Sequence, residues 1–300
     1  MRIVSLVPHA TELLFALGLG DSVVGVTHEC DHPTEALDRP RVTSDRLPPG
    51  LSAAEIDAAV RERTGRGEAI YDLDVELLRE LEPDLIVTQA LCPVCAVSYD
   101  DVRAVAAKMD PEPRVIALDP TTFGEAVNDI RTLSDATGAK EAAFLLIASI
   151  ARRVEAVRRA VEGAEPVPVA ALEWLDPPFA AGHWTPQLIE MAGGIDVVGL
   201  PGERSEQVTW EQVRAAQPEV VVCMPCGYGA GRALEEAERY AGELGSLGAR
   251  RVVAIDAAGT FSRPGPRLVE ALELMAHILH PDRIPEAPSA PLDVEVATPR

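Results

Sequence analysis

The chain has very little lysine and few aromatic side chains. Only two of its 300 residues are lysines, Lys108 and Lys140, and aromatic residues make up 4% of the sequence. Its 48 acidic residues outnumber 27 basic ones, which gives a formal net charge of −21. A surface this acidic repels the phosphates of nucleic acids and of anionic lipids. We therefore expect neither nucleic acid nor a membrane among its partners.

Export signals and long apolar runs are also missing from the sequence. The first residues, MRIVSLVPHATE, lead straight into a strand pattern without the basic and apolar regions of a secretory signal. The longest apolar stretches are too short and too interrupted to span a bilayer. These features predict a cytoplasmic protein. Cysteines stay reduced in that compartment, so a structural disulfide is the poorer interpretation of the CPVC stretch (92–95).

Familiar catalytic motifs are missing as well. The sequence has no arrangement that suggests a Ser-His-Asp triad, a phosphate-binding loop or a GxGxxG dinucleotide fingerprint. The glycine-rich stretch GYGAGR (227–232) lacks the spacing of such a fingerprint. We therefore predict a protein that is not an enzyme.

What the sequence does contain is an internal repeat. Three stretches recur in the same order, and each combines a helix end or a turn with a short apolar strand. The pairs are ELLFALGLGDSVVGV (12–26) with QLIEMAGGIDVVGL (187–200), LEPDLIVTQ (81–89) with AQPEVVVCMP (216–225), and RVIALD (114–119) with RVVAID (251–256). A duplicated order of this kind predicts two similar α/β lobes with parallel sheets.

The repeat also sets the expected domain boundaries. Apolar residues at three- and four-residue steps between the two copies predict a long helix that ends near Val161, with Gly138 separating it from a shorter one. The predicted parts are an N-terminal lobe (1–119) with a helical insertion at about 45–71, linking helices (120–165), a C-terminal lobe (166–280) and a loosely ordered, proline-rich tail (281–300).

These stretches resemble a known family. RIVSLVPHATELLFALGLGDSVVGV, LDPPFAAGHWTPQLIEMAGGIDVV and FSRPGPRLVEALELMAHIL, together with the linking helix, are similar to the helical-backbone (class III) substrate-binding proteins of ABC importers for cobalamin and ferric siderophores. The cobalamin-binding branch is the most similar. The resemblance covers about residues 2–280. It implies two Rossmann-like lobes joined by a backbone helix, with a ligand cleft between the lobes.

The resemblance also implies partners and some site residues. Phe261 and Arg263 match the stretch that closes the pocket in this family, and Glu190 matches a glutamate that docks on the importer. The matching region of the first lobe, near Tyr99–Asp101, offers only aspartates. The missing export signal and this departure leave delivery to an importer in doubt, whereas ligand binding is expected.

The loops after the carboxyl ends of parallel strands are the expected ligand site. Aromatic walls with a few polar contacts suit a large flat ligand such as a corrin or haem. The alternative for Trp174 or Phe179 is that the side chain seals the lobe core. The predicted ligand-binding residues are Pro8, His9, Trp174, Asp176, Phe179, His183, Trp184, Tyr228, Phe261 and Arg263.

Two of these residues have alternative roles. The imidazole of His183 could coordinate cobalt or iron, although a lone loop histidine is more often a plain hydrogen-bonding residue. Asp176 precedes two prolines, so it could accept a hydrogen bond from a ligand amide or simply shape a turn.

Four cysteines fall in the same set of loops: Cys30, Cys92, Cys95 and Cys226. Four thiolates suit zinc or an iron–sulfur cluster, but a CxxC pair is by itself a weak signal. A redox pair and reduced packing thiols are the alternatives. Cys223 lies inside an apolar strand and is expected to be a small core residue.

Two functions follow from the sequence. The favoured one is non-enzymatic binding of cobalamin or a related corrinoid between the lobes, with haem or a siderophore as other possible ligands. The alternative is a cytoplasmic metal or iron–sulfur redox protein, with cysteine ligands, on the same scaffold.

Overall fold

The computed structural model describes residues 1–48, 50–90 and 97–296. The chain divides into two compact units. The first unit comprises Met1–Pro120 and Glu125–Ala148, and the second comprises Thr121–Gly124 and Ser149–Arg300. No described helix is both long and apolar enough to cross a lipid bilayer.

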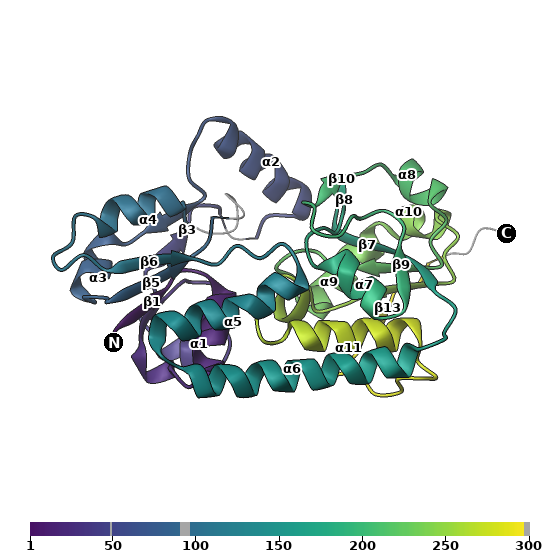
Figure 1. Ribbon diagram of the computed structural model, residues 1–300. Coiled ribbons are helices and arrows are strands. Elements are labelled where there is room, and N and C mark those ends of the chain that lie inside the picture. Colours follow the sequence, from purple (N-terminus) through teal and green to yellow (C-terminus); the bar gives the residue numbers. More distant parts are fainter. Residues whose placement is uncertain (49, 91–96, 297–300) are drawn as a thin grey trace. The chain divides into compact units, whose positions relative to one another are not determined.

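The first unit is built on a four-stranded parallel sheet in the order β2-β1-β5-β6. Its strands are short and rich in valine and isoleucine, which suits buried parallel pairing. The elements, all but β2 and β4 labelled in Figure 1, are β1 (Ile3–Ser5), α1 (Pro8–Ala16), β2 (Val23–Val26), β3 (Thr43–Asp45), α2 (Ala53–Gly65), β4 (Tyr71–Leu73), α3 (Val75–Glu80), β5 (Leu85–Thr88), α4 (Tyr99–Ala106), β6 (Arg114–Ala117) and α5 (Phe123–Thr137), with short 3₁₀ turns at Gly20–Ser22 and Thr34–Asp38.

The predicted insertion forms a small substructure of the first unit. Strands β3 and β4 pair antiparallel, with Thr43 opposite Leu73 and Asp45 opposite Tyr71. Helix α2 lies between them in the chain (Figure 1). It begins at a capping box, in which Ser52 and Glu55 each accept a hydrogen bond from the other's backbone N–H.

The second unit repeats this sheet and adds strands to it. Strands β9, β7, β11 and β12 are all parallel neighbours in that order, and β8, β10 and β13 extend the sheet in antiparallel fashion. The elements are β7 (Val167–Leu175), β8 (Pro178–Ala180), α7 (Thr185–Met191), β9 (Gly194–Asp196), β10 (Glu206–Gln207), α8 (Trp210–Ala215), β11 (Val220–Cys223), α9 (Ala230–Arg239), α10 (Ala241–Ser246), β12 (Arg251–Ala254), a π-helix (Ala257–Phe261), α11 (Leu268–Leu279) and β13 (Leu292–Asp293).

The order β9-β7-β11-β12 matches β2-β1-β5-β6 strand for strand. The predicted fold class of two similar α/β lobes is therefore confirmed. Along the chain, α6 (Lys140–Val161) follows the strands of the first sheet and precedes those of the second, and its 22 residues give a length of about 33 Å at 1.5 Å per residue. Gly138, at φ +83°, separates α5 from α6, because glycine adopts this backbone conformation without steric cost.

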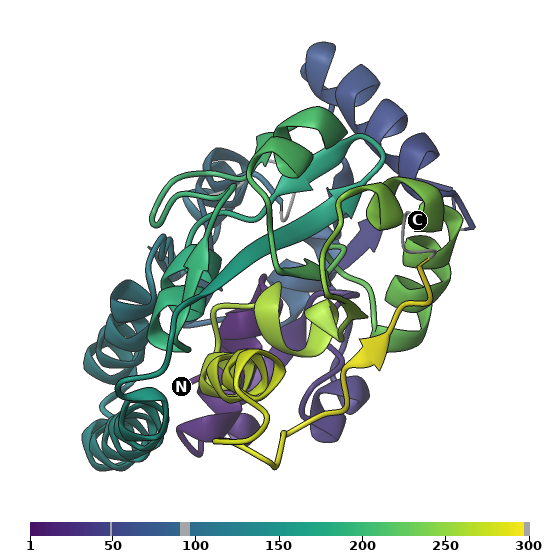
Figure 2. The ribbon, with the colours of Figure 1, turned by 90° about the vertical axis from the view of Figure 1, so that its right-hand side faces the viewer.

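The end of the chain differs from the loose tail that the sequence predicts. Leu292 and Asp293 pair with Ala254 and Val253 as strand β13, seen in yellow in Figure 2. The backbone N–H of Val294 donates to Val252 O (2.9 Å), and its side chain is buried. The alternation of Leu292 and Val294 with acidic residues suits a strand with one buried face.

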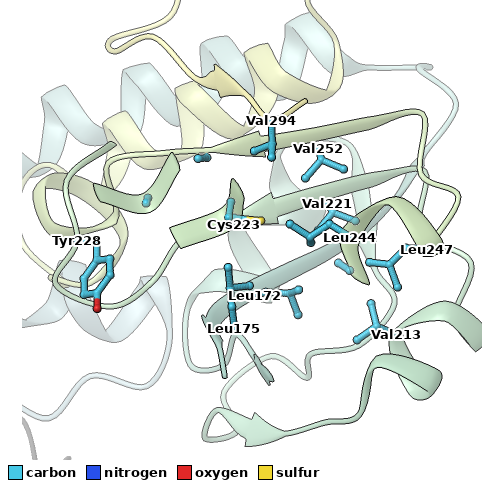
Figure 3. Packing of buried hydrophobic residues seen from close by; sticks show 14 residues of the cluster. Leu172, Leu175, Val213, Val221, Cys223, Tyr228, Leu244, Leu247, Val252 and Val294 are labelled. Carbon is cyan, nitrogen blue, oxygen red and sulfur yellow. The ribbon is translucent and has the colours of Figure 1, made fainter. Parts of the chain in front are cut away.

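A core cluster in the second unit lies on one face of its sheet, because its strand residues pair directly with one another. It includes Leu172 from β7, Val221 and Cys223 from β11, and Val294 from the tail (Figure 3). Tyr228 lies at one end of the same cluster, where the chain leaves β11 (Figure 3). The core therefore fixes the strand ends from which the candidate site begins.

Candidate functional site

The stretch predicted as one aromatic loop, residues 173–184, is largely a β-hairpin. Strand β7 continues to Leu175, and β8 folds back on it so that Trp174 lies opposite Phe179. Asp176 and Pro177 form the turn between the two strands. Residues that lie directly opposite each other on paired strands point to the same face of the sheet, so the two aromatic side chains are neighbours. Both side chains are partly exposed.

The partly exposed Trp174 forms one wall of the candidate site, and Tyr228, which follows β11 and is 3% exposed, packs against it. Their rings meet edge to face, with centroids 5.6 Å apart. The guanidinium carbon of Arg232, in α9, lies 3.7 Å from the centroid of the Tyr228 ring, and its Nη2 donates to the Tyr228 hydroxyl (3.0 Å). Burial raises the pKa of Tyr228. These contacts hold the tyrosine between an aromatic ring and a cation.

Asp176 is held at the rim of this wall. The hydroxyl of Tyr240 donates to its Oδ2 (2.9 Å), and Nε1 of Trp174 donates to its backbone carbonyl (3.1 Å). Burial is the largest cause that raises the pKa of Tyr240 to about 12, and the hydrogen bond to Asp176 is the second. This phenol therefore stays protonated, and remains a donor, at neutral pH. The turn role and the ligand role predicted for Asp176 are thus compatible.

Trp184 and Phe261 lie deeper than a direct ligand contact requires. Trp184 is 8% exposed and Phe261 is 1% exposed. Nε1 of Trp184 donates to the Phe261 carbonyl (2.8 Å). Because the indole N–H and this carbonyl satisfy each other in the interior, the two residues support the site in the described structure. Arg263, two residues further on, is partly exposed.

His183 lies in a tight turn with φ +53°, and its backbone N–H donates to Glu203 O (2.6 Å). Its ring is half-buried and lies 5.5 Å from the Trp184 ring. Burial and the charge of Arg204 lower its pKa. The imidazole is therefore neutral at pH 7, as a ligand to a metal must be.

Sequence reasoning missed Glu173, the residue before Trp174. Burial raises its pKa to about 7, although Ser205 and the Gly182 backbone hydrogen-bond to its carboxylate. The chain packs closely there, because a Cβ on Gly182 would lie 2.6 Å from the Glu203 carbonyl oxygen. The one available signal was a glutamate within an otherwise apolar strand.

In the first unit, the predicted residues Pro8 and His9 begin α1, directly after β1. Pro8 is partly exposed and His9 is buried. They occupy the same place in this sheet as residues 176–184 do in the other, since β1 and β7 are the corresponding strands. That all of these loops face one ligand stays a prediction.

The cysteines do not form a described metal site. Cys30 is buried, with its sulfur 3.1 Å from Thr11 Oγ1 and 3.3 Å from Thr27 Oγ1. Cys226 is exposed, whereas Cys92 and Cys95 lie outside the described residues. Within residues 1–48, 50–90 and 97–296, no group of three or more His, Cys, Asp or Glu side chains could hold a metal ion. The metal and redox hypotheses therefore gain no support here.

Cys223 is a core residue, as expected. It is 0% exposed in β11, and burial raises the pKa of its thiol to about 12. A thiol of this kind is chemically inert at neutral pH. Glu190, the predicted docking residue, is exposed on α7.

The model of the Periplasmic binding protein family matches residues 3–242. The chain belongs to this family. The vitamin B12-binding protein of Vibrio cholerae is 24% identical over 281 residues, which cover 91% of this chain and 86% of the relative. The uncharacterized ABC transporter substrate-binding lipoprotein YvrC of Bacillus subtilis is 25% identical over 296 residues, covering 95% of this chain and 82% of the relative.

A solved structure shows the same fold. The apo form of the periplasmic heme-binding protein RhuT from Roseiflexus sp. RS-1 aligns with a TM-score of 0.64 at 24% identity, covering 94% of this chain and 98% of that one. The predicted membership of the cobalamin and siderophore branch of binding proteins is confirmed by these likenesses. The family is one of binding proteins rather than enzymes.

The predicted cytoplasmic location is wrong. The relatives include a substrate-binding lipoprotein of an ABC transporter, and the matching family is described as periplasmic binding proteins, which points to a place outside the cytoplasm. The prediction relied on the absence of a recognisable signal before the first strand. The likeness along nearly the whole chain is the stronger observation.

Proposed function

We propose that this binding protein holds cobalamin or a related corrinoid and presents it to an ABC importer, without catalysing a reaction. The observation that carries the proposal is the partly exposed ring of Trp174, supported by Tyr228 and Arg232, beside the Asp176 carboxylate. Aromatic faces suit the large ring of a corrin, and a carboxylate rim suits its amide N–H donors. The relative from Vibrio cholerae, whose name states vitamin B12 binding, supports the same ligand class.

Haem is the second candidate, because RhuT is a heme-binding protein. Charge argues against it here. Haem carries two carboxylates, which Asp176 at the rim repels; the guanidinium of Arg232 is already engaged with the Tyr228 ring and hydroxyl, and the chain as a whole has a formal charge of −21. Bringing like charges together weakens binding. A corrinoid with neutral amides avoids this repulsion.

Calorimetric titration with cyanocobalamin, hydroxocobalamin and haemin separates the two candidates. We expect saturable binding of both cobalamins, and weaker binding of haemin that improves as salt screens the charge. Tight binding of haemin alone would replace the corrinoid by haem. A folded sample that binds none of the three would refute both ligands.

Delivery to an importer rests on the exposed Glu190 of α7. Reversing its charge in Glu190→Arg should lower the stimulation of the importer's ATPase in liposomes, while calorimetry shows unchanged cobalamin affinity. Glu238→Arg is a matched control, since Glu238 is an exposed glutamate on α9 of the same unit. Equal loss of stimulation in both variants would show a general charge effect and no docking role for Glu190.

A further inference from the structure

Glu173 lies where three segments of the second unit meet. It directly precedes Trp174 on β7, at the point where the pairing of β7 with β8 shifts register between Leu172 and Trp174. The backbone carbonyl of Glu173 accepts a hydrogen bond from the Cys226 N–H (3.1 Å), in the segment after β11 that carries Tyr228. Its main chain therefore joins the two strand ends that carry the rings of Trp174 and Tyr228.

The side chain of Glu173 reaches two further parts of the same unit. Its carboxylate accepts hydrogen bonds from the Ser205 hydroxyl and from the Gly182 backbone N–H. Gly182 directly precedes His183, one of the predicted ligand-binding residues, and Ser205 is the last residue of the connection between β9 and β10 (residues 197–205). One carboxylate thus holds the hairpin segment and this connection to β7.

The hairpin segment and the connection also pack against each other through their backbones. The His183 N–H donates to Glu203 O (2.6 Å), and the Gly202 N–H donates to His183 O (2.9 Å). A Cβ on Gly182 would lie 2.6 Å from the carbonyl carbon of Arg204, so the two backbones leave no room for a side chain there. A change at Glu173 should therefore move both segments together.

The charge of Glu173 opposes this packing. Burial raises its pKa from about 4.5 to about 7. The packed arrangement then holds the proton more tightly than one in which the carboxyl reaches water, so packing is most stable below about pH 4.5 and weakens as pH rises to about 7. Burial and then the charge of Arg204 lower the pKa of His183, which can titrate in the lower part of this range. The charged or titratable groups on the segments packed against Glu173 are Asp176, His183, Glu203, Arg204 and Cys226.

We propose that Glu173 is a positioning residue for the bound corrinoid, because it holds three segments of the candidate site in one arrangement. These segments carry Trp174, His183 and Tyr228. The inference rests on the proposed function and concerns residues of the second unit alone. A ligand that contacts these segments binds more tightly when they are already held together, because binding then does not have to order them. Glu173 acts through the segments and needs no contact with the ligand itself.

Two substitutions separate the hold on the segments from the charge. Glu173→Ala removes the carboxylate and should lower the affinity for cyanocobalamin at pH 7 by about tenfold or more in calorimetry. Glu173→Gln keeps an oxygen that can accept from the Gly182 N–H and a polar group for Ser205, so it should restore most of this affinity. Circular dichroism shows whether each variant is folded. If Glu173→Ala is not, Glu173→Gln carries the test through its pH profile.

The pH profile of binding tests the titration of Glu173. Each pH unit between about 4.5 and about 7 changes the packing equilibrium by up to about tenfold. We therefore expect the wild-type affinity for cyanocobalamin to fall by about tenfold or more between pH 5 and pH 8, whereas Glu173→Gln should keep one affinity across this range.

Asp196→Asn is the matched control for the loss of charge. Burial also raises the pKa of Asp196, to about 6, but its Oδ1 accepts from the Val198 and Gly199 N–H groups of its own turn (2.9 and 2.7 Å). The amide oxygen of asparagine can accept the same bonds. This variant should therefore keep the pH profile of the wild-type chain.

A measurement without ligand follows the connection itself. Arg204 is exposed and precedes Ser205, so tryptic cleavage after Arg204 reports the opening of residues 197–205. At pH 8 this cleavage should be about tenfold faster in Glu173→Ala than in Glu173→Gln, with the wild-type chain between them.

The other outcomes decide against one proposal or the other. Equal cobalamin affinities of the wild type, Glu173→Ala and Glu173→Gln would overturn the role of Glu173 and leave the proposed function standing. A fall of affinity with pH that persists in Glu173→Gln would assign the titration to another group, such as His183, and overturn it for Glu173. Failure of the folded wild-type chain to bind either cobalamin would overturn the proposed function, while the cleavage rates would still decide whether Glu173 holds the connection.

Discussion

The indole of Trp184 should contribute more to the stability of the second unit than the indole of Trp174 does. In Trp184→Phe the Phe261 carbonyl loses the donor that now lies 2.8 Å away, in a position where Trp184 is 8% and Phe261 1% exposed. An unpaired buried carbonyl costs about 1–3 kcal/mol. The smaller ring leaves additional unfilled volume, so we expect a total loss of about 2–4 kcal/mol.

Trp174→Phe is the matched control. It also removes an indole donor, but the acceptor is the Asp176 carbonyl in a partly exposed turn, where water can replace the lost bond. We expect a loss of about 1 kcal/mol or less there. For units of this size 1 kcal/mol corresponds to about 2–4 °C, so thermal melting followed by far-ultraviolet circular dichroism separates the two variants. Equal melting temperatures would refute the assignment of Trp184 to the interior.

Three further predictions concern Asp129, Gly182 and Tyr240. Burial, with Asp119 and Glu125 adding to it, raises the pKa of Asp129 to about 7; the native state then holds this proton more tightly than the unfolded state, so stability falls as pH rises from about 4 to about 7. At about 1.4 kcal/mol per pKa unit, Asp129→Asn should stabilise the chain by up to about 4 kcal/mol at pH 8 and should hardly change its stability at pH 4. Urea unfolding at the two pH values measures this difference, and equal gains at both would contradict the prediction. Gly182→Ala should cost about 1–3 kcal/mol because its Cβ would meet backbone, whereas Gly242→Ala, in open space within a helix, should be neutral or stabilising in the same assay. Tyr240→Phe should lower cobalamin affinity several-fold by freeing the Asp176 carboxylate, with a stability change of about 1 kcal/mol or less; unchanged affinity would remove Asp176 from the ligand contacts.

The sequence predicted the fold because the fold repeats itself. Each apolar strand follows a helix end or a turn, and both copies keep the same order along the chain, so LIVT (85–88) and VVVC (220–223) were recognisable as corresponding central strands. The tail could not be predicted in the same way. Its strand depends on the free edge of β12, and a pair of residues such as Leu292 and Asp293 carries too little pattern to reveal it.

The residues of the candidate site were easier to name from the sequence than the burial of each side chain was to predict. The aromatic residues of 173–184 were singled out as a group, and their role in binding stays a prediction, but which of them is buried depends on partners far away in the chain. Trp184 meets Phe261 across 77 residues, and Asp176 meets Tyr240 across 64. Neither contact has a local signal. The hairpin has one in retrospect, since two prolines follow Asp176 where the chain reverses.

The two sheets differ most at the carboxyl ends of their strands. After β7 the second unit adds the hairpin strand β8, whereas after β2 the first unit adds the substructure of β3, α2 and β4. The parallel strands themselves are constrained, because their side chains are buried between helices and tolerate few changes of volume. Loops beyond the strand ends carry no such constraint and can acquire residues for a ligand. Each addition also brings contacts to a half-buried residue: Phe179 lies opposite Trp174, and Thr43 and Tyr71 hold His28. The departures from the repeat are therefore where ligand choice should be encoded, and the repeat itself encodes the scaffold that carries it.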